Sequence, residues 1–381
     1  MYRSLTRGSA RLVALALACA LPATVAASAS AHPGPARGLP EFPPGGGFEG
    51  AVYTETNSTA GNTVLVFDRE PSGALVAAGS SPTGGTGTGT GLGSGHSVVA
   101  SASGRFVVAV NAGSNSISVF RAGRGGLTQV GEATASGGTT PTSVTISGRL
   151  VYVMNAGSGT ISGFWLSDRW GLIPIAGSTQ PLAAADTATD SQIQFSRDGN
   201  VLIVDERGTA NLLQTFVVGP GGIAGPGASV AADAGAPFGF DVDDSGHVLF
   251  SNAAFGTSSA ASSYDISDTG ALTPNGPPVS SGQAAACWLA AVGGFAYTDN
   301  AGSGSIGRYA VASDGDLTLT GTTLIASTAH PLDMVGVADR FLYVLANGES
   351  EILGYRVSPD GDLAPVAQVA VPAGVDGLGG S

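Results

Sequence analysis

An aromatic residue followed seven or eight positions later by Leu or Ile recurs seven times along this chain. The seven pairs are Phe67 with Leu75, Phe120 with Leu127, Phe164 with Leu172, Phe216 with Ile223, Tyr264 with Leu272, Tyr309 with Leu317, and Tyr355 with Leu363. Successive aromatic residues lie 53, 44, 52, 48, 45 and 46 positions apart. Such a spacing is typical of repeat proteins, in which each repeat is one supersecondary unit packed against the next. The pattern therefore predicts seven copies of one structural unit.

One repeat resolves into four extended runs, at residues 98–102, 106–110, 116–120 and 127–130. Each run is short, rich in Val, Ile and Phe, and bounded by Gly, Asn or Ser, as in an antiparallel meander. The turn sequence Asn-Ala-Gly-Ser, beginning at Asn111, Asn155 and Asn300, follows the second run. Four strands in each of seven units predict an all-β fold, a seven-bladed β-propeller of four-stranded antiparallel blades.

The two ends of the repeat array and one insertion depart from this pattern. Residues 50–54 have no first strand before them, whereas residues 372–378 resemble a first strand with nothing after it. We expect the C-terminal strand to pair into the first blade near Val52 and so close the ring. Residues 83–95 are a Gly and Thr tract without an apolar period. We interpret this tract as a flexible surface loop, with a binding lid as the alternative.

The N-terminal 31 residues have the features of a signal peptide. Three arginines at positions 3, 7 and 11 precede an apolar stretch over 12–21 and an Ala-Ser-Ala run ending at Ala31. We expect cleavage near Ala31, a disordered Pro/Gly-rich tail over 32–49, and a propeller over 50–381. No later segment offers the roughly 18 uninterrupted apolar residues of a membrane span. The sequence predicts a secreted, extracellular monomer.

The charge balance excludes several classes of function. Loss of the signal peptide removes three of 15 basic residues and none of 28 acidic ones, so the net charge becomes 12 minus 28, or −16. Nucleic acid and anionic lipid are poor partners for such a chain, because both require clustered positive charge. The chain contains no lysine. Schiff-base chemistry and Walker-type phosphate loops, which need an amine, are therefore excluded.

Several segments resemble one known family. Gly95-His96-Ser97-Val98, followed by Asn111-Ala112-Gly113-Ser114 and Ile117-Ser118-Val119-Phe120, resembles a repeat of the lactonase-type seven-bladed propellers. That family includes 6-phosphogluconolactonase-like and carboxymuconate-lactonizing enzymes. The segments Val-Tyr-Val-Met-Asn at 151–155 and Leu-Tyr-Val-Leu-Ala-Asn at 342–347 are similar to the Tyr-Val-Thr-Asn (YVTN) repeats of related surface propellers. The resemblance extends from about Ala51 to the end of the chain.

The resemblance implies a lactone-processing site at the mouth of the propeller channel. His96 and His330, the latter followed by Pro331, are similar to histidines at strand starts in the family. The third blade departs from the family pattern, because Thr140-Pro141-Thr142 stands where His-Pro-His is expected. Lactone opening needs a general base and an Arg or His that stabilises the developing charge.

The first strands of the blades line the channel, so residues at their starts converge at one mouth. By this register, His96 and His330 are the candidate catalytic residues, and Asp333 or Asp376 is an orienting carboxylate. The candidate ligand-binding residues at the mouth are Asp190, Gln192, Asp241, Asp333 and Asp376.

We expect no cofactor and no metal ion. The alternative is a calcium ion, because Asp241-x-Asp243-x-Ser245-Gly246 resembles the start of a calcium-binding loop. Position twelve of that loop is Asn252 instead of the bidentate Glu of an EF-hand, which favours a simple turn.

Two functions fit these observations. The first is an extracellular binding module that recognises a small molecule, a carbohydrate or a protein at the mouth. The alternative is a lactone hydrolase or lactonizing isomerase. The missing third-blade histidines, and the expectation that no arginine lies at the mouth, favour the binding module, while fold alone does not decide between the two functions.

Overall fold

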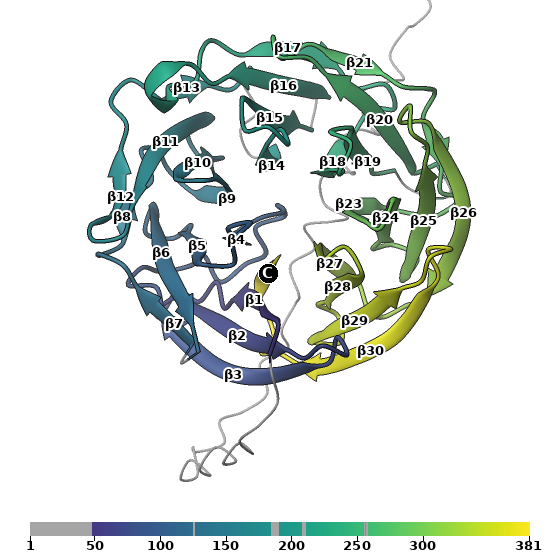
Figure 1. Cartoon of the computed structure of the whole chain (residues 1–381), viewed down its shortest axis with the longest axis horizontal. Coiled ribbons are helices and arrows are strands. Elements are labelled where there is room, and N and C mark those ends of the chain that lie inside the picture. The colour runs from purple at the N-terminus through teal and green to yellow at the C-terminus, as the bar shows by residue number, and fades with distance from the viewer. Residues whose placement is uncertain (1–47, 125, 184–189, 208–210, 255, 257) are drawn as a thin grey trace, which may run out of the picture.

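Seven antiparallel sheets form a ring around a central channel (Figure 1). The computed structural model describes residues 48–381, except 125, 184–189, 208–210, 255 and 257. The predicted signal peptide and the predicted tail up to residue 47 lie outside the described residues. Each sheet has a four-strand antiparallel path, so the predicted seven-bladed β-propeller is confirmed.

The blades are numbered along the chain, and the strands of each are given from the channel outward. Blade 1 contains β31 (Asp376–Gly380), β1 (Gly50–Glu55), β2 (Thr63–Arg69) and β3 (Leu75–Pro82). Blade 2 contains β4 (Val98–Ala100), β5 (Phe106–Asn111), β6 (Ser116–Gly123) and β7 (Gly126–Gln129), with β8 (Thr134–Ala135) paired to β6. Blade 3 contains β9 (Pro141–Ser147), β10 (Leu150–Asn155), β11 (Thr160–Ser167) and β12 (Gly171–Pro174), with β13 (Gln180–Pro181) paired to β11.

The remaining blades repeat this order. Blade 4 contains β14 (Asp190–Phe195), β15 (Val201–Glu206), β16 (Leu212–Val217) and β17 (Ala228–Ala231). Blade 5 contains β18 (Pro237–Val242), β19 (Val248–Asn252), β20 (Ala260–Ile266) and β21 (Leu272–Pro274), with β22 (Val279–Ser280) paired to β20. Blade 6 contains β23 (Ala286–Val292), β24 (Phe295–Asn300), β25 (Ser305–Val311) and β26 (Leu317–Leu324). Blade 7 contains β27 (Pro331–Val337), β28 (Phe341–Ala346), β29 (Glu351–Val357) and β30 (Leu363–Ala370).

The repeated aromatic residues pack between neighbouring blades. Each of the seven lies in the third strand of its blade and is at most 6% exposed. Each belongs to a different cluster of buried apolar side chains that joins its blade to the one before it. Phe120 of blade 2, for example, packs with Tyr53 and Val66 of blade 1. The period found in the sequence is therefore the period of the contacts between blades.

The second residue of the aromatic-to-leucine pair lies in the fourth strand of every blade except blade 4, where it is Ile223. This side chain is 39% exposed and follows the helical turn η2 (Pro220–Gly222) instead of lying in a fourth strand. Gly221 within η2 has a φ of 76°, which suits a glycine and ends the extended backbone. The fourth strand of blade 4, β17, begins only at Ala228.

The C-terminal strand closes the ring as predicted. β31 pairs antiparallel with β1, with Val52 opposite Gly380 and Glu55 opposite Asp376. Leu378 is fully buried in the apolar cluster that joins blades 7 and 1. Gly377 has a φ of 68°, and a Cβ atom there would lie 2.0 Å from Ser97 Oγ. Glycine at this position therefore lets the last strand fit beside blade 2.

Residues 83–95, which we call the plug, are not a surface loop, so that interpretation is wrong. The connection from β3 to β4 runs into the centre of the ring (Figure 1). Thr83 and Ser94 are buried, and Asn57 holds the plug by donating to Thr90 O at 2.7 Å and accepting from Thr88 N at 2.8 Å. Glycines at alternate positions give the plug the small volume that a narrow channel accepts.

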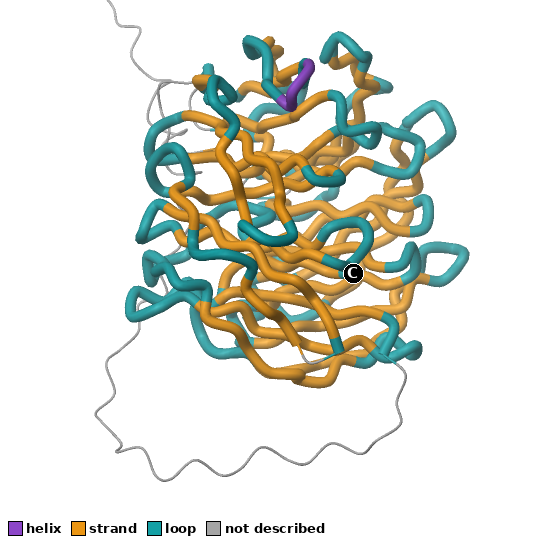
Figure 2. Tube along the Cα trace, turned by 60° about the vertical axis from the view of Figure 1, so that its left-hand side comes forward, coloured by secondary structure: helices purple, strands orange, loops and turns teal. Residues whose placement is uncertain are grey.

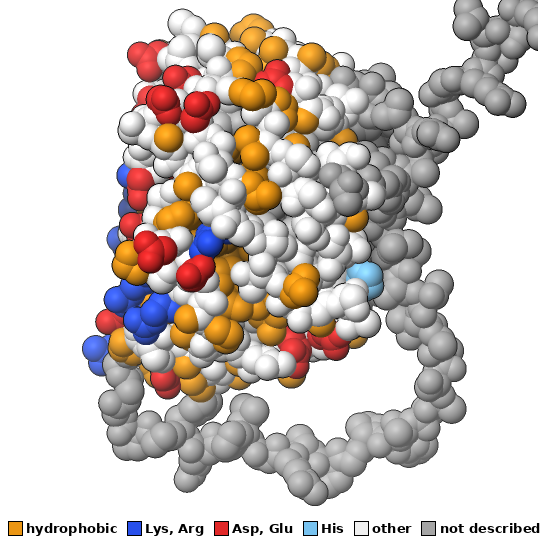
Figure 3. Space-filling model, turned by 90° about the vertical axis from the view of Figure 1, so that its right-hand side faces the viewer, with side chains coloured by type: hydrophobic (Ala, Val, Ile, Leu, Met, Phe, Trp, Pro, Cys, Tyr) orange, Lys and Arg blue, Asp and Glu red, His pale blue; other side chains and the backbone are white. Residues whose placement is uncertain are grey.

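Strands and short loops make up most of the described chain (Figure 2). On the side shown in Figure 3, uncharged side chains cover most of the surface. The charged side chains lie mainly along the left-hand and lower edges of that view. Burial alternates along β26, as it does in an outer strand with one wet face. No helix among the described residues has the length and apolar character needed to cross a bilayer.

Loss of the Leu378 side chain is expected to weaken the ring closure. Leu378→Ala should lower the free energy of unfolding by about 2–5 kcal/mol, the usual result of emptying a buried leucine site. The control is Leu324→Ala, because Leu324 is 78% exposed, and its effect should stay within about 0.5 kcal/mol. Urea denaturation measures both variants, and equal effects would show that β31 does not hold the ring closed.

Candidate active site

Four buried carboxyl groups follow one side of the channel. They are Glu55 at the end of β1, Asp376 at the start of β31, Asp333 in β27 and Asp299 in β24. Each is at most 5% exposed. Glu55 interacts electrostatically with Asp376, Asp376 with Asp333, and Asp333 with Asp299. Blades 1, 7 and 6 thus contribute one continuous group, which we call the acidic arc.

Burial raises the pKa of every carboxyl in the acidic arc. It raises the pKa of Asp333 to about 8 and that of Asp376 to about 6, and it places the pKa values of Glu55 and Asp299 well above their usual range. Backbone amides oppose the shift, because Asp333 accepts from Met334 N and Leu378 N, both at 2.8 Å. At pH 7 Asp376 is therefore mostly ionised while Asp333 holds a proton.

Irregularities in the inner strands direct these side chains. The register shifts between Pro331 and Asp333, and it shifts again between Ala286 and Trp288. At the second shift the Trp288 amide donates to Asp299 Oδ1 at 2.9 Å. A β-bulge frees a backbone amide and turns a side chain, which is a common device beside active sites.

Of the two predicted catalytic histidines, His96 lies beside the acidic arc. Its backbone amide lowers the pKa of Asp333, and burial lowers the pKa of its own imidazole. Its Nδ1 is buried and has no hydrogen-bond partner among the described residues. A neutral imidazole with an open nitrogen can accept a hydrogen bond from a ligand.

His330 lies in a different environment. It occupies the equivalent position, since both histidines have a positive φ one or two residues before an inner strand. However, His330 is exposed, and its Nδ1 lies 3.3 Å from the carbonyl oxygen of Ala301. Within the described part of the chain, no hydrogen bond or ion pair joins the two imidazoles. The structure therefore brings together His96, Asp333 and Asp376, without His330.

The other predicted mouth residues make contacts between blades. Gln192 Nε2 donates to Phe240 O at 2.5 Å, and Asp241 Oδ2 accepts from Ala291 N at 2.9 Å. Asp241 also influences the pKa of His96, which places it near that ring. Asp190 begins β14, but its side chain lies outside the described residues.

Arg207 is a mouth residue that sequence reasoning missed. It is 7% exposed, its Nη2 donates to Gly93 O at 2.9 Å, and its guanidinium lies 3.8 Å from the centre of the Phe238 ring. The expectation that the mouth lacks arginine is therefore wrong. Alignment of the repeats could have predicted it, because Arg207 directly follows the second strand of blade 4, at the position that Ala156 occupies in blade 3.

The tip of the plug, residues 91–95, covers these groups. Leu92 N donates to Asp376 Oδ2 at 2.7 Å, and Ser94 Oγ donates to Thr142 O at 2.7 Å. With the bond from Arg207 to Gly93, the tip is tied to blades 1, 3 and 4. A Cβ atom on Gly95 would lie 2.5 Å from the Gln192 amide oxygen, so the fit leaves no room for a larger residue.

The turn at Asp243 explains the calcium-like sequence. Asp243 Oδ1 accepts from Ser245 N and His247 N, which is ordinary turn chemistry. Across the part of the chain that the structure describes, no group of three or more His, Cys, Asp or Glu side chains is arranged to hold a metal ion.

The chain is similar in sequence to one family model and in fold to several solved propeller structures. The family model described as "Lactonase, 7-bladed beta-propeller" matches residues 60–287. A putative 6-phosphogluconolactonase from Bacteroides uniformis has a TM-score of 0.66 at 20% identity, covering 87% of this chain and 100% of that one. A second, from Bacteroides fragilis, has a TM-score of 0.65 at 18% identity, with 87% and 98% covered. The periplasmic gluconolactonase of Pseudomonas aeruginosa has a TM-score of 0.66 at 15% identity, with 86% and 98% covered. No curated protein sequence matches.

The raised pKa values predict that stability falls as pH rises. Asp333 and Asp376 bind protons more tightly in the folded state than in the unfolded state, so folding takes up protons. The free energy of unfolding should therefore decrease from about pH 4 until both native pKa values are passed, near pH 8, and then level off. The expected loss is on the order of 5–10 kcal/mol, because one pKa unit corresponds to about 1.4 kcal/mol and the two pKa values lie about 4 and about 2 units above that of an ordinary aspartate.

Urea denaturation between pH 4 and pH 9 measures this slope. Asp333→Asn should flatten it and should raise stability relative to the wild type at pH 8.5. Asp314→Asn serves as the exposed control and should leave the slope unchanged. Stability that rises through this interval in the wild type would contradict the assignment.

Proposed function

We propose that this chain, which belongs to the lactonase family of seven-bladed β-propellers, hydrolyses a small lactone at its channel mouth. The observation that carries the proposal is the interacting pair of Asp376 and Asp333, whose pKa values are about 6 and about 8. Two carboxyls with pKa values separated in this way supply a base and an acid at the same pH. The likeness to proteins described as lactonases supports this reading over a simple binding module.

The reaction adds water across the ring ester. The Asp376 carboxylate takes a proton from a water molecule, and the water oxygen bonds to the lactone carbonyl carbon. The ring C–O bond then breaks, and the protonated Asp333 gives its proton to the departing ring oxygen, which yields a hydroxy acid. One proton moving from Asp376 to Asp333 restores the starting state.

Arg207 and His96 would bind the substrate and its transition state in this scheme. The guanidinium of Arg207 would stabilise the negative charge that develops on the carbonyl oxygen. The buried, open Nδ1 of His96 would accept a hydrogen bond from a substrate hydroxyl. The ionised carboxylate of Asp376 would repel a neighbouring anion, so we propose a neutral, hydroxylated lactone as the substrate instead of a phosphorylated one.

Access to Asp376 requires displacement of the plug tip. The Leu92 amide bonds directly to the Asp376 carboxylate, and Gly93 has a φ of 64°. Glycine-rich segments rearrange readily because their backbone populates many conformations. We propose that the substrate replaces the tip, as a lid does in enzymes that close over their reactants. Export across a membrane remains part of the proposal and rests on the signal peptide.

A binding module is the second candidate, and one observation favours it. The tip already fills the mouth, and Asp333, Asp376 and Asp241 all accept hydrogen bonds from backbone amides. A propeller with this mouth could bind a partner elsewhere without catalysing any reaction.

Hydrolysis of glucono-δ-lactone separates the two candidates. We expect turnover above the buffer rate, with Asp376→Asn and Asp333→Asn lowering kcat/KM by about 100-fold or more, as loss of a general base or acid usually does. The dependence of kcat/KM on pH should be bell-shaped, with limbs near pH 6 and pH 8. Arg207→Gln should lower kcat, and 6-phosphogluconolactone should be the poorer substrate.

His330→Ala is the control variant and should retain wild-type kcat/KM, whereas His96→Ala should raise KM. Thermal unfolding of each variant shows whether it is folded. A wild-type rate equal to that of buffer, for both lactones, would favour the binding module. Full activity in Asp376→Asn would remove that residue from the mechanism.

A further inference from the structure

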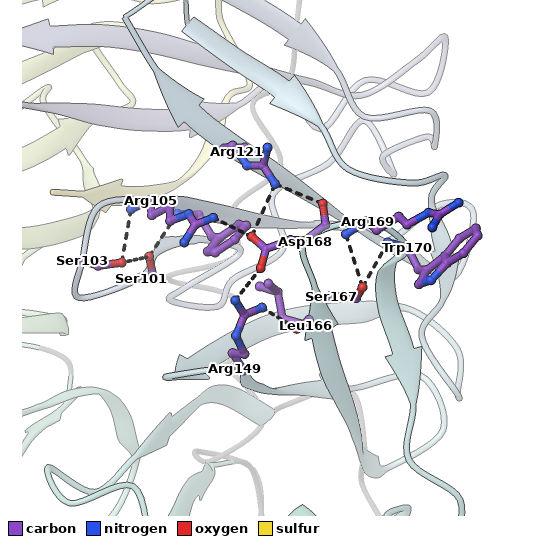
Figure 4. A network of polar contacts seen from close by, with 11 residues as sticks. Ser101, Ser103, Arg105, Arg121, Arg149, Leu166, Ser167, Asp168, Arg169 and Trp170 are labelled. Carbon is purple, nitrogen blue, oxygen red and sulfur yellow. Dashed lines mark hydrogen bonds and ion pairs between the residues drawn. The ribbon is translucent and has the colours of Figure 1, made fainter.

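Three arginines converge on one carboxylate at the end of the propeller opposite the mouth (Figure 4). Arg105 donates to Asp168 Oδ1 at 2.7 Å and Arg121 at 3.3 Å, while Arg149 pairs with Oδ2. All three are about half exposed, at 53%, 46% and 48%. The three arginines are 63, 47 and 19 positions from Asp168 in sequence, so only the fold brings them together.

The topology places this group away from the acidic arc. The inner strand of each blade starts at the mouth, and the antiparallel second strand ends there. Arg105 and Arg149 precede the second strands of blades 2 and 3, and Asp168 lies in the turn between β11 and β12. These turns are at the opposite end of the blades. A ligand held here leaves the mouth uncovered.

An exposed tryptophan adjoins the arginines. Trp170, two positions after Asp168, is 64% exposed and is the most exposed aromatic side chain among the described residues. The Arg169 guanidinium lies 4.5 Å from its ring centre. Ser167 Oγ accepts from the amides of both residues, at 3.3 and 3.1 Å, which fixes the turn. The Arg169 guanidinium thus lies over one face of the indole, and most of the remaining ring surface is open to solvent.

The local charge opposes that of the whole chain. Three arginines, at positions 105, 121 and 149, face the single carboxylate of Asp168, so three minus one gives +2 on a chain of net charge −13. The bond from Arg149, followed by the charges of the other arginines, holds the pKa of Asp168 below its usual value. One carboxylate has about four lone-pair sites and each guanidinium five N–H donors. Donors therefore remain for a second anion.

We propose that this arginine–tryptophan surface, made of Arg105, Arg121, Arg149, Arg169 and Trp170, binds a polysaccharide that carries carboxylate groups. Guanidinium groups match carboxylates in a planar, two-bond geometry. The exposed indole offers an apolar face with the size of a sugar ring. A uronic acid polymer presents both features in one chain, a carboxylate at the edge of each charged ring and an apolar ring face beside it.

The same observations disfavour other polyanions. Duplex DNA carries about one charge per 1.7 Å, and the acidic remainder of this chain would repel so dense a polymer. An acidic peptide would satisfy the arginines but offers no ring face for Trp170. The surface thus fits a polymer with spaced charges and flat rings.

Binding of the full mature chain to polygalacturonate tests the proposal. At low salt we expect retention that falls when the carboxylates are methyl-esterified or the salt concentration is raised. Arg149→Gln should weaken binding by about tenfold, the effect of losing one charge-assisted hydrogen bond. Asp168→Asn should strengthen binding, because it removes the competing carboxylate. A purely structural role for the ion-pair cluster predicts no gain from that change.

Arg340→Gln is the matched control, since Arg340 is 45% exposed and is paired with Glu49 at the junction of blades 7 and 1, away from blades 2 and 3. It should leave polygalacturonate binding unchanged. Trp170→Ala should weaken binding to polygalacturonate without changing binding to polyglutamate. No retention at low salt, or equal losses in Arg149→Gln and Arg340→Gln, would overturn the proposal. Equal or tighter binding of polyglutamate or duplex DNA, with no effect of Trp170→Ala, would overturn it in favour of those polymers.

Discussion

Apolar packing between neighbouring blades is the interaction on which the rest of this molecule depends. Seven clusters of buried side chains, one at each junction, join the blades within the described residues. Each junction receives one aromatic ring from a third strand, which buries a large area at a fixed place. Because every blade is held by two such junctions, the inner strands keep a constant distance from the axis. The channel and its mouth are consequences of that spacing.

The acidic arc holds more ionisable groups than the fold requires. Ser251 of blade 5 and Asp299 of blade 6 occupy equivalent positions, and each accepts from a backbone amide at an irregularity of the inner strand, Gly239 N and Trp288 N respectively. A neutral hydroxyl thus serves this structural role as well as a carboxylate does. A buried carboxyl with a raised pKa destabilises the folded state at neutral pH. Groups retained at such a cost are characteristic of sites that perform chemistry.

Sequence reasoning was sufficient wherever the physical cause lies within one repeat. The aromatic spacing predicted the blades because each ring serves the same junction, and the unmatched strand at each end predicted the closure. It failed at Ile223, where the local Pro220-Gly221-Gly222 turn delays a strand. It also failed where distant segments meet: Arg207 reaches the plug across 114 positions, and Arg105 reaches Asp168 across 63. The two histidines share a register position, and only their surroundings separate their roles: His96 is half-buried with a buried Nδ1, and His330 is exposed.

The pairing of β1 with β31 has a consequence for the timing of folding. Glu55 is paired with Asp376, a separation of 321 positions. At about 5–20 residues per second, synthesis of that interval takes on the order of half a minute. Throughout this time blade 1 lacks its inner strand, and its edge is open to pairing with other chains. The ring therefore completes only after β31 has left the ribosome, and a chain that stops before β31 keeps the inner edge of β1 unpaired, where a protease or chaperone can recognise it.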